Sequence, residues 1–202
     1  MQKTLLELAD YIKTTQSSFI QKLWIEHGEL IAEAVTENIV PLTAFLRDDS
    51  HCQFTQLIDI CGVDYPSRPK RFEVVYNFLS VKFNQRIRVK LHTDDLTPVP
   101  SVTGLFSSAG WYEREVWDMY GVYFSDNPDL RRILTDYGFD GHPQRKDFPL
   151  TGYVELRYDP ERRRVAYGPV KLPQAFRTFD FMSPWEGAEY ILPGDEKAKV
   201  GS

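Results

Sequence analysis

Four charged residues within one predicted helix, Glu113, Arg114, Glu115 and Asp118, have the types and spacing that chemistry would need. Arg114 and Asp118 are one helical turn apart and can pair, and Glu115 and Asp118 share a neighbouring face. Two close carboxylates can raise the pKa of one of them, which suits general acid catalysis. The same residues can instead form an ion-pair network that fixes the helix end. We favour the network, because no nucleophile, metal ligand or oxyanion-binding element lies beside them.

Paired basic residues follow this helix at two places, Arg131-Arg132 and Arg145-Lys146-Asp147. Such pairs can bind phosphate through bidentate hydrogen bonds, or they can hold carboxylates across a protein interface. With no glycine-rich loop nearby, the interface is the stronger interpretation. His142 lies in a Gly-His-Pro turn, where we expect a structural hydrogen bond.

Motifs that bind cofactors are missing from the sequence. Neither G-x-G-x-x-G nor G-x-x-x-x-G-K-[ST] occurs, so neither a dinucleotide nor a phosphate cradle is indicated. Cys52 and Cys61 are the only cysteines, too few to hold an iron–sulfur cluster alone and more simply structural and reduced. The formal charge of -5 argues against a nucleic-acid binder. The chain shows no secretory signal and no apolar run long enough to span a bilayer, so we expect it to work in the cytoplasm.

Hydrophobic spacing predicts an α+β domain over residues 1–124. The periodicity indicates helices over 5–23, after a cap near Asn38 and up to Gly121, and strands over 30–35, 54–61, 72–79 and 86–92. A turn near Asn84 makes the last two strands an antiparallel hairpin. We expect a two-layer sandwich of a mostly antiparallel sheet with packed helices.

The rest of the chain, residues 125–202, has a different character. Seven of its prolines lie beyond residue 140, and large aromatic residues run through it without a period. A segment so rich in aromatic residues must bury them, so we expect an extended segment that wraps around partner proteins. The alternative is that the segment folds back over the chain's own sheet.

Five ordered blocks of sequence resemble the C subunit of proton-pumping NADH:quinone oxidoreductase, respiratory complex I, and most closely its alphaproteobacterial members. The central block, residues 111–122, contains E-R-E-x-x-D-x-x-G, and the other matching blocks are 60–66 with 71–77, 128–139, 141–152 and 179–186. The resemblance covers residues 29–193. Two residues depart from the family pattern: Asn127 stands in place of His, and Gln144 in place of Leu. We expect Gln144 to be tolerated at the edge of an interface.

The resemblance implies a structural component of the peripheral arm that has no active site and holds no cofactor, the flavin and iron–sulfur clusters being in partner subunits. The implied partners are the quinone-site D subunit, over which the C-terminal segment runs, and the cluster-bearing B and I subunits. The implied location is the cytoplasmic side of the bacterial inner membrane, or the matrix side if the chain is organelle-encoded. The assembled enzyme couples electron transfer from NADH to quinone with proton translocation.

The residues that we expect to serve this assembly are charged or aromatic. They are Glu113, Arg114, Glu115, Asp118, Arg131, Arg132, His142, Arg145, Lys146, Asp147, Phe176, Phe179, Phe181 and Trp185. A stand-alone hydrolase that uses Glu113, Glu115 and Asp118 is a second hypothesis. A component of a related membrane-bound hydrogenase is a third, which the match through Gly152 and into the C-terminal segment disfavours.

Overall fold

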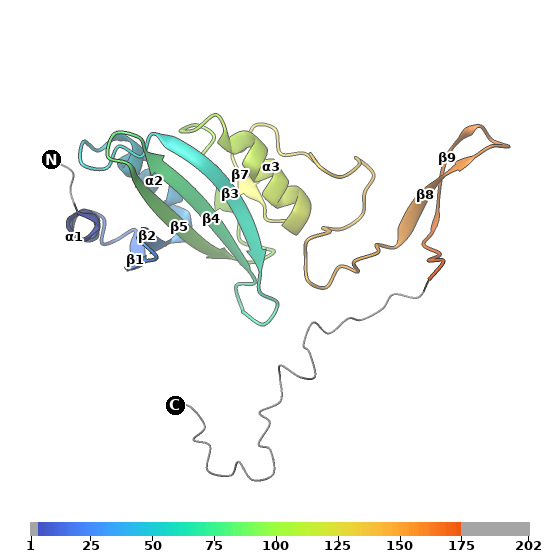
Figure 1. Cartoon of the computed structure of the whole chain (residues 1–202), viewed down its shortest axis with the longest axis horizontal. Coiled ribbons are helices and arrows are strands. Elements are labelled where there is room, and N and C mark those ends of the chain that lie inside the picture. The colour runs from blue at the N-terminus through green and yellow to red at the C-terminus, as the bar shows by residue number, and fades with distance from the viewer. Residues whose placement is uncertain (1–3, 175–202) are drawn as a thin grey trace, which may run out of the picture. The chain divides into compact units, whose positions relative to one another are not determined.

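The computed structural model describes residues 4–174, which form parts of two compact units (Figure 1). The first unit ends at Gly152, and the second begins at Tyr153. The sequence placed this boundary at residue 124, whereas the structure groups residues 125–152 with the first unit. The reason is that the loop after the third helix is hydrogen-bonded to that helix and to the sheet.

Three helices and a five-stranded sheet make up the first unit, which confirms the α+β prediction. In chain order its elements are α1 (Leu5–Thr15), β1 (Ile20–Glu26), β2 (Glu29–Ala34), the 3-10 helix η1 (Thr36–Asn38), α2 (Ile39–Asp48), β3 (Gln56–Asp64), β4 (Phe72–Ser80), β5 (Gln85–Thr93), β6 (Val99–Pro100), α3 (Ala109–Tyr120) and β7 (Phe124–Ser125). The sheet order is β1-β2-β5-β4-β3, and only its β2–β5 pair is parallel within the described chain. No helix among residues 4–174 is long and apolar enough to cross a membrane.

The first predicted helix is wrong beyond Thr15. A capping box, in which Thr4 and Glu7 bond each other's backbone N–H groups, starts α1 as expected. Residues 20–26 form the edge strand β1 instead of more helix, and β1 pairs with β2 through a turn in which His27 and Gly28 both have positive φ. Apolar residues four apart suit a helix and a partly exposed edge strand alike, so spacing alone could not separate the two.

One hydrophobic core joins the three helices to one face of the sheet. Ala32, Val89, Tyr76 and Ile60 are successive cross-strand neighbours on β2, β5, β4 and β3, and all four are buried. The opposite face carries charged side chains from the same strands, because successive residues of a strand point to opposite faces. The predicted two-layer arrangement is confirmed.

Helix α3 lies close against β3 because a glycine faces it. A Cβ atom on Gly62 would come within 2.6 Å of the Tyr120 ring, so no larger residue fits there without a shift. The helix ends at Gly121, as predicted, with φ +80° in the left-handed region that favours glycine. The chain then continues into the loop over residues 126–152, which carries most of the predicted site.

Candidate functional site

Glu113, on the buried side of α3, is fully enclosed. Its carboxylate accepts hydrogen bonds from the Ser101 hydroxyl at 2.7 Å, the Val102 backbone N–H at 2.8 Å and the Asn127 amide at 2.7 Å. Burial raises the pKa of Glu113, and these three donors oppose that rise. Asn127 also accepts the backbone N–H of Asp129 at 2.9 Å, so this departure from the family pattern has a structural role.

Asp118, one turn and a half further along α3, organises the loop that follows. One oxygen accepts the successive backbone N–H groups of Ile133, Leu134 and Thr135 at 3.0, 2.8 and 3.0 Å. The other accepts the Thr135 hydroxyl at 2.6 Å and the Arg132 guanidinium at 2.7 Å. Burial alone would raise the pKa of Asp118, but these donors outweigh it and hold the pKa well below its ordinary value. Asp118 is therefore an ionised carboxylate that fixes the backbone.

Two guanidinium groups brace the same loop from opposite sides. Arg114, which is nearly buried, donates to the carbonyl oxygens of Arg131 and Arg132 at 3.0 and 2.8 Å. Arg132 in turn donates to the Gly141 carbonyl at 3.0 Å and lies 5.6 Å from the centre of the Trp117 ring. Arg114 thus holds the loop backbone, and Arg132 ties the loop back to α3.

Arg145 and His142 close the loop over the C-terminal end of α3. Arg145 donates to the Tyr120 carbonyl at 2.6 Å and to Asp95 at 2.6 Å. The Nδ1 atom of His142 lies 3.0 Å from the Asp118 carbonyl oxygen, so Nδ1 carries the proton that it donates there. Burial lowers the pKa of His142, which favours the neutral imidazole. The structural hydrogen bond predicted for His142 is confirmed.

The last part of the loop is tied to the sheet by Arg71. Its guanidinium donates to Asp64 at 2.6 and 2.8 Å and to Asp147 at 2.7 and 3.1 Å, so it bridges two carboxylates. Asp64 also accepts the backbone N–H of Lys146 at 2.7 Å. The hydrogen bonds from Arg71 lower the pKa of Asp64 and of Asp147. Sequence reasoning missed Arg71 and Asp64, although each lies in a block that matches the family.

The structure thus brings most of the predicted site residues into one network within the chain. Glu113 and Asp118 are completely buried, so neither can touch a substrate, and this geometry argues against the hydrolase hypothesis. Glu115 and Lys146 have exposed side chains that remain available to a partner. No group of three His, Cys, Asp or Glu residues within residues 4–174 could hold a metal ion. Phe176, Phe179, Phe181 and Trp185 lie outside the described residues.

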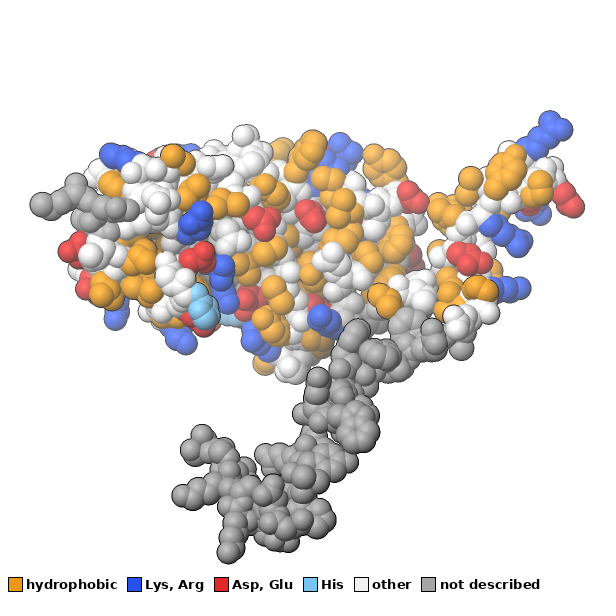
Figure 2. Space-filling model, viewed as in Figure 1, with side chains coloured by type: hydrophobic (Ala, Val, Ile, Leu, Met, Phe, Trp, Pro, Cys, Tyr) orange, Lys and Arg blue, Asp and Glu red, His pale blue; other side chains and the backbone are white. Residues whose placement is uncertain are grey.

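The second unit contains an antiparallel hairpin of β8 (Val154–Asp159) and β9 (Arg164–Pro169). Three cross-strand pairs share one face, which is entirely apolar: Val154 with Pro169, Leu156 with Tyr167, and Tyr158 with Val165. Five of these side chains remain largely exposed: Val154 (57%), Leu156 (52%), Tyr158 (64%), Val165 (59%) and Tyr167 (67%). Hydrophobic side chains follow the hairpin in Figure 2. The period-two alternation could have revealed this hairpin in the sequence.

Fold and site together define a structural α+β domain whose prominent charged residues fix its own loop. Residues 32–154 match the family described as "Respiratory-chain NADH dehydrogenase, 30 Kd subunit", and the chain belongs to this family. The resemblance drawn from the motifs is confirmed.

Named relatives extend the match to nearly the whole chain. The NADH-quinone oxidoreductase C subunit of Rhizobium etli, in its form numbered 1, is 61% identical over 98% of this chain and 100% of that protein. The corresponding C subunit of Paramagnetospirillum magneticum is also 61% identical, over 98% and 100%. Among solved structures, a chain of the archaeal membrane-bound sulfane sulfur reductase, a respiratory membrane complex, is similar at 25% identity with a TM-score of 0.62, covering 73% of this chain and 87% of that one.

Proposed function

We propose that this chain is a structural component of NADH:quinone oxidoreductase that holds no cofactor and has no active site. It contributes to electron transfer and proton translocation by keeping partner subunits in place. Its proposed partners are the quinone-site D subunit and the cluster-bearing B and I subunits, and its proposed location is the cytoplasmic side of the inner membrane. Membership of the family, and relatives named as the C subunit of NADH-quinone oxidoreductase, support this role.

The observation that carries the docking role is the apolar face of the β8–β9 hairpin. A two-stranded hairpin is marginally stable in water, and this one leaves its apolar side chains largely exposed. Covering each half-exposed side chain would contribute roughly 1–2 kcal/mol. A partner that covers this face would therefore gain affinity and order the hairpin at once.

The buried carboxylates support the absence of chemistry in this chain. Glu113 and Asp118 have 0% of their surface exposed, and each is hydrogen-bonded by three or more groups of the chain. Acid–base catalysis needs a group within hydrogen-bonding reach of the substrate. In this account the two residues keep the loop in a shape that partners recognise.

The hairpin allows a test with a matched control. Leu156 and Tyr167 face each other across the apolar face, and Arg157 and Ala166 do so across the polar face. We expect Leu156→Ser with Tyr167→Ser to lower the yield of assembled complex about tenfold, the effect of about 1.4 kcal/mol. Arg157→Ser with Ala166→Ser should leave the yield near that of the wild type. Native gels of solubilised membranes measure both; equal yields for the two pairs would contradict the docking role of this face.

A further inference from the structure

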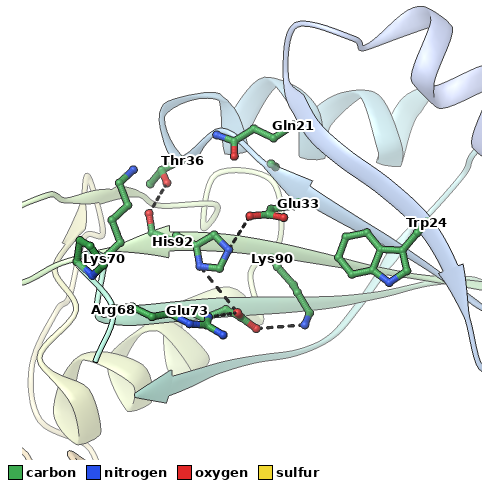
Figure 3. A pocket seen from close by; sticks show the side chains of 11 residues that line it. Gln21, Trp24, Glu33, Thr36, Arg68, Lys70, Glu73, Lys90 and His92 are labelled. Atoms are coloured by element: carbon green, nitrogen blue, oxygen red, sulfur yellow. Dashed lines mark hydrogen bonds and ion pairs between the residues drawn. The ribbon is translucent and has the colours of Figure 1, made fainter. Parts of the chain in front are cut away.

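A hollow of about 620 Å³ lies on the charged face of the sheet, opposite the core (Figure 3). Its floor consists of Glu73, Lys90 and His92 from β4 and β5, with Glu33 of β2 beside them. Its walls are Gln21 and Trp24 of β1 on one side and residues 68–70 of the β3–β4 connection on the other. None of these residues belongs to the network around α3.

The two carboxylates of the hollow are already paired within the chain. Glu73 lies 3.2 Å from Lys90 Nζ and 3.3 Å from Arg68 Nη1, and only 7% of its side chain is exposed. Glu33 lies 2.8 Å from His92 Nε2. Figure 3 shows both carboxylates directed at these partners. The hollow therefore offers no free carboxylate to a ligand.

Cationic donors, in contrast, remain available. Lys70 is exposed and forms no hydrogen bond or ion pair with the described residues. Arg68 uses one of its N–H groups on Glu73, and its guanidinium is held 3.6 Å from the centre of the Tyr65 ring. Three Lys or Arg side chains line the hollow against two carboxylates, so the surplus charge is positive. Fixed donors with surplus positive charge suit an anionic ligand.

The β1 wall favours an extended polypeptide as this ligand. The Trp24 indole N–H donates to Glu26 at 3.1 Å, which fixes the ring at the side of the hollow as a surface for apolar contact. Strand β1 is the outermost strand at this end of the sheet, and an edge strand presents unpaired backbone groups. A small anion would use only the lysine and arginine side of the hollow, whereas an extended segment could also contact Trp24 and the strand edge.

We propose that this hollow binds an acidic, extended segment of another protein of the complex, with Lys70 and Arg68 paired to its carboxylates and Trp24 covered by its apolar side chains. This inference rests on the proposed function, because it needs a complex in which the chain has neighbours. It adds a second docking surface, independent of the β8–β9 hairpin. Charge complementarity at such a surface sets which partner is accepted and in which register.

Zero-length carbodiimide cross-linking of the intact purified complex tests the proposal, because the reagent joins an amine to a carboxylate only when the two are in direct contact. We expect Lys70 to be linked to an Asp or Glu residue of another protein of the complex, identified by mass spectrometry. Lys82, an exposed lysine of the β4–β5 turn, should remain unlinked and is the control. Acetylation of lysines in the same complex should modify Lys70 about fivefold less than Lys82, as expected for an amine held in an ion pair.

Lys70→Glu and Lys82→Glu make the same change of charge and complete the test. We expect Lys70→Glu to lower retention of the chain in complexes washed at raised salt about threefold, and Lys82→Glu to leave it unchanged. Equal acetylation of both lysines in a complex that contains the chain would overturn this inference and leave the proposed function standing. Binding of ATP to the full chain that Lys70→Glu abolishes, together with the absence of links to other proteins, would also overturn it and favour a small-anion site. Absence of the chain from the complex would contradict the proposed function itself.

Discussion

Asp118 accepts two hydrogen bonds from Thr135, one from its backbone N–H at 3.0 Å and one from its hydroxyl at 2.6 Å. The two residues are 17 positions apart, and the segment between them carries no regular secondary structure apart from the end of α3 and β7. This pairing sets the course of the loop, because the neighbouring backbone N–H groups of Ile133 and Leu134 bind the same carboxylate. A single buried charge thus takes the place of a secondary-structure element.

Removing that charge while keeping its size should loosen the loop. Asp118→Asn replaces an oxygen that accepts hydrogen bonds with an NH₂ group that faces N–H donors, and it leaves Arg132 without its carboxylate. We expect the free energy of unfolding of the full chain to fall by about 3 kcal/mol. Urea denaturation measures the change. Asp136→Asn is the control, since Asp136 is exposed in the same loop, and it should cost little.

Stability should depend on pH through the same carboxylate. The pKa values of Asp118 and Asp64 are both lowered in the folded chain, below about 3.9 in the unfolded chain. Their stabilisation is therefore fully present above about pH 5 and is lost as the pH falls toward their folded pKa values. Burial raises the pKa of Glu113, which acts in the opposite direction. Asp118→Asn removes one contribution and leaves the others, so its unfolding free energy should fall less steeply between about pH 5 and pH 3. Parallel curves for the two proteins would contradict this assignment.

Two glycines separate backbone strain from crowding. Gly28 and Gly121 have φ of +78° and +80°, but a Cβ on Gly28 meets open space, whereas one on Gly121 would lie 2.5 Å from Arg145 and 2.7 Å from His142. Gly28→Ala should therefore cost about 1 kcal/mol, the strain of a left-handed backbone alone. Gly121→Ala should cost about 3 kcal/mol and expose the loop to limited proteolysis. Equal losses of stability would show that the loop does not pack on the helix end.

Residues beyond Gln174 are expected to add to docking. Phe176, Phe179, Phe181 and Trp185 are large aromatic residues in a proline-rich sequence, the composition from which a partner-wrapping segment was predicted. Deleting the chain from Phe176 onward should lower the amount of complex that contains the quinone-site D subunit. Quantitative immunodetection of that partner in purified complexes measures this loss. Assembly at the wild-type yield would contradict the wrapping prediction.

Periodic segments of the fold could be predicted from the sequence, and the loop could not. The β4–β5 hairpin and the end of α3 at Gly121 followed from alternation, turn residues and a glycine cap. In β3 the alternation breaks at a register shift between Leu57 and Asp59, which leaves Ile58 39% exposed although the pattern suggested burial. A bulge depends on the neighbouring strand, and no local pattern records it.

Candidate site residues were found by type but not by role. The sequence selected Glu113, Arg114 and Asp118 because charged residues gathered in one turn, and the structure places all three within the chain's own network. Their partners include backbone groups 11 to 18 positions away, and a backbone group has no signature in the sequence. The interface role of the exposed residues Glu115 and Lys146 stays a prediction.

The quotient of NADH:quinone turnover and the amount of assembled complex tests the central claim most directly. It should be measured in membranes that carry Glu115→Gln, Asp118→Asn, or Leu156→Ser with Tyr167→Ser. A docking protein without chemistry predicts that each variant loses turnover only in proportion to the complex it fails to assemble, so that the quotient equals that of the wild type. A variant that assembles fully and yet loses most of its turnover would contradict the account and place chemistry in this chain.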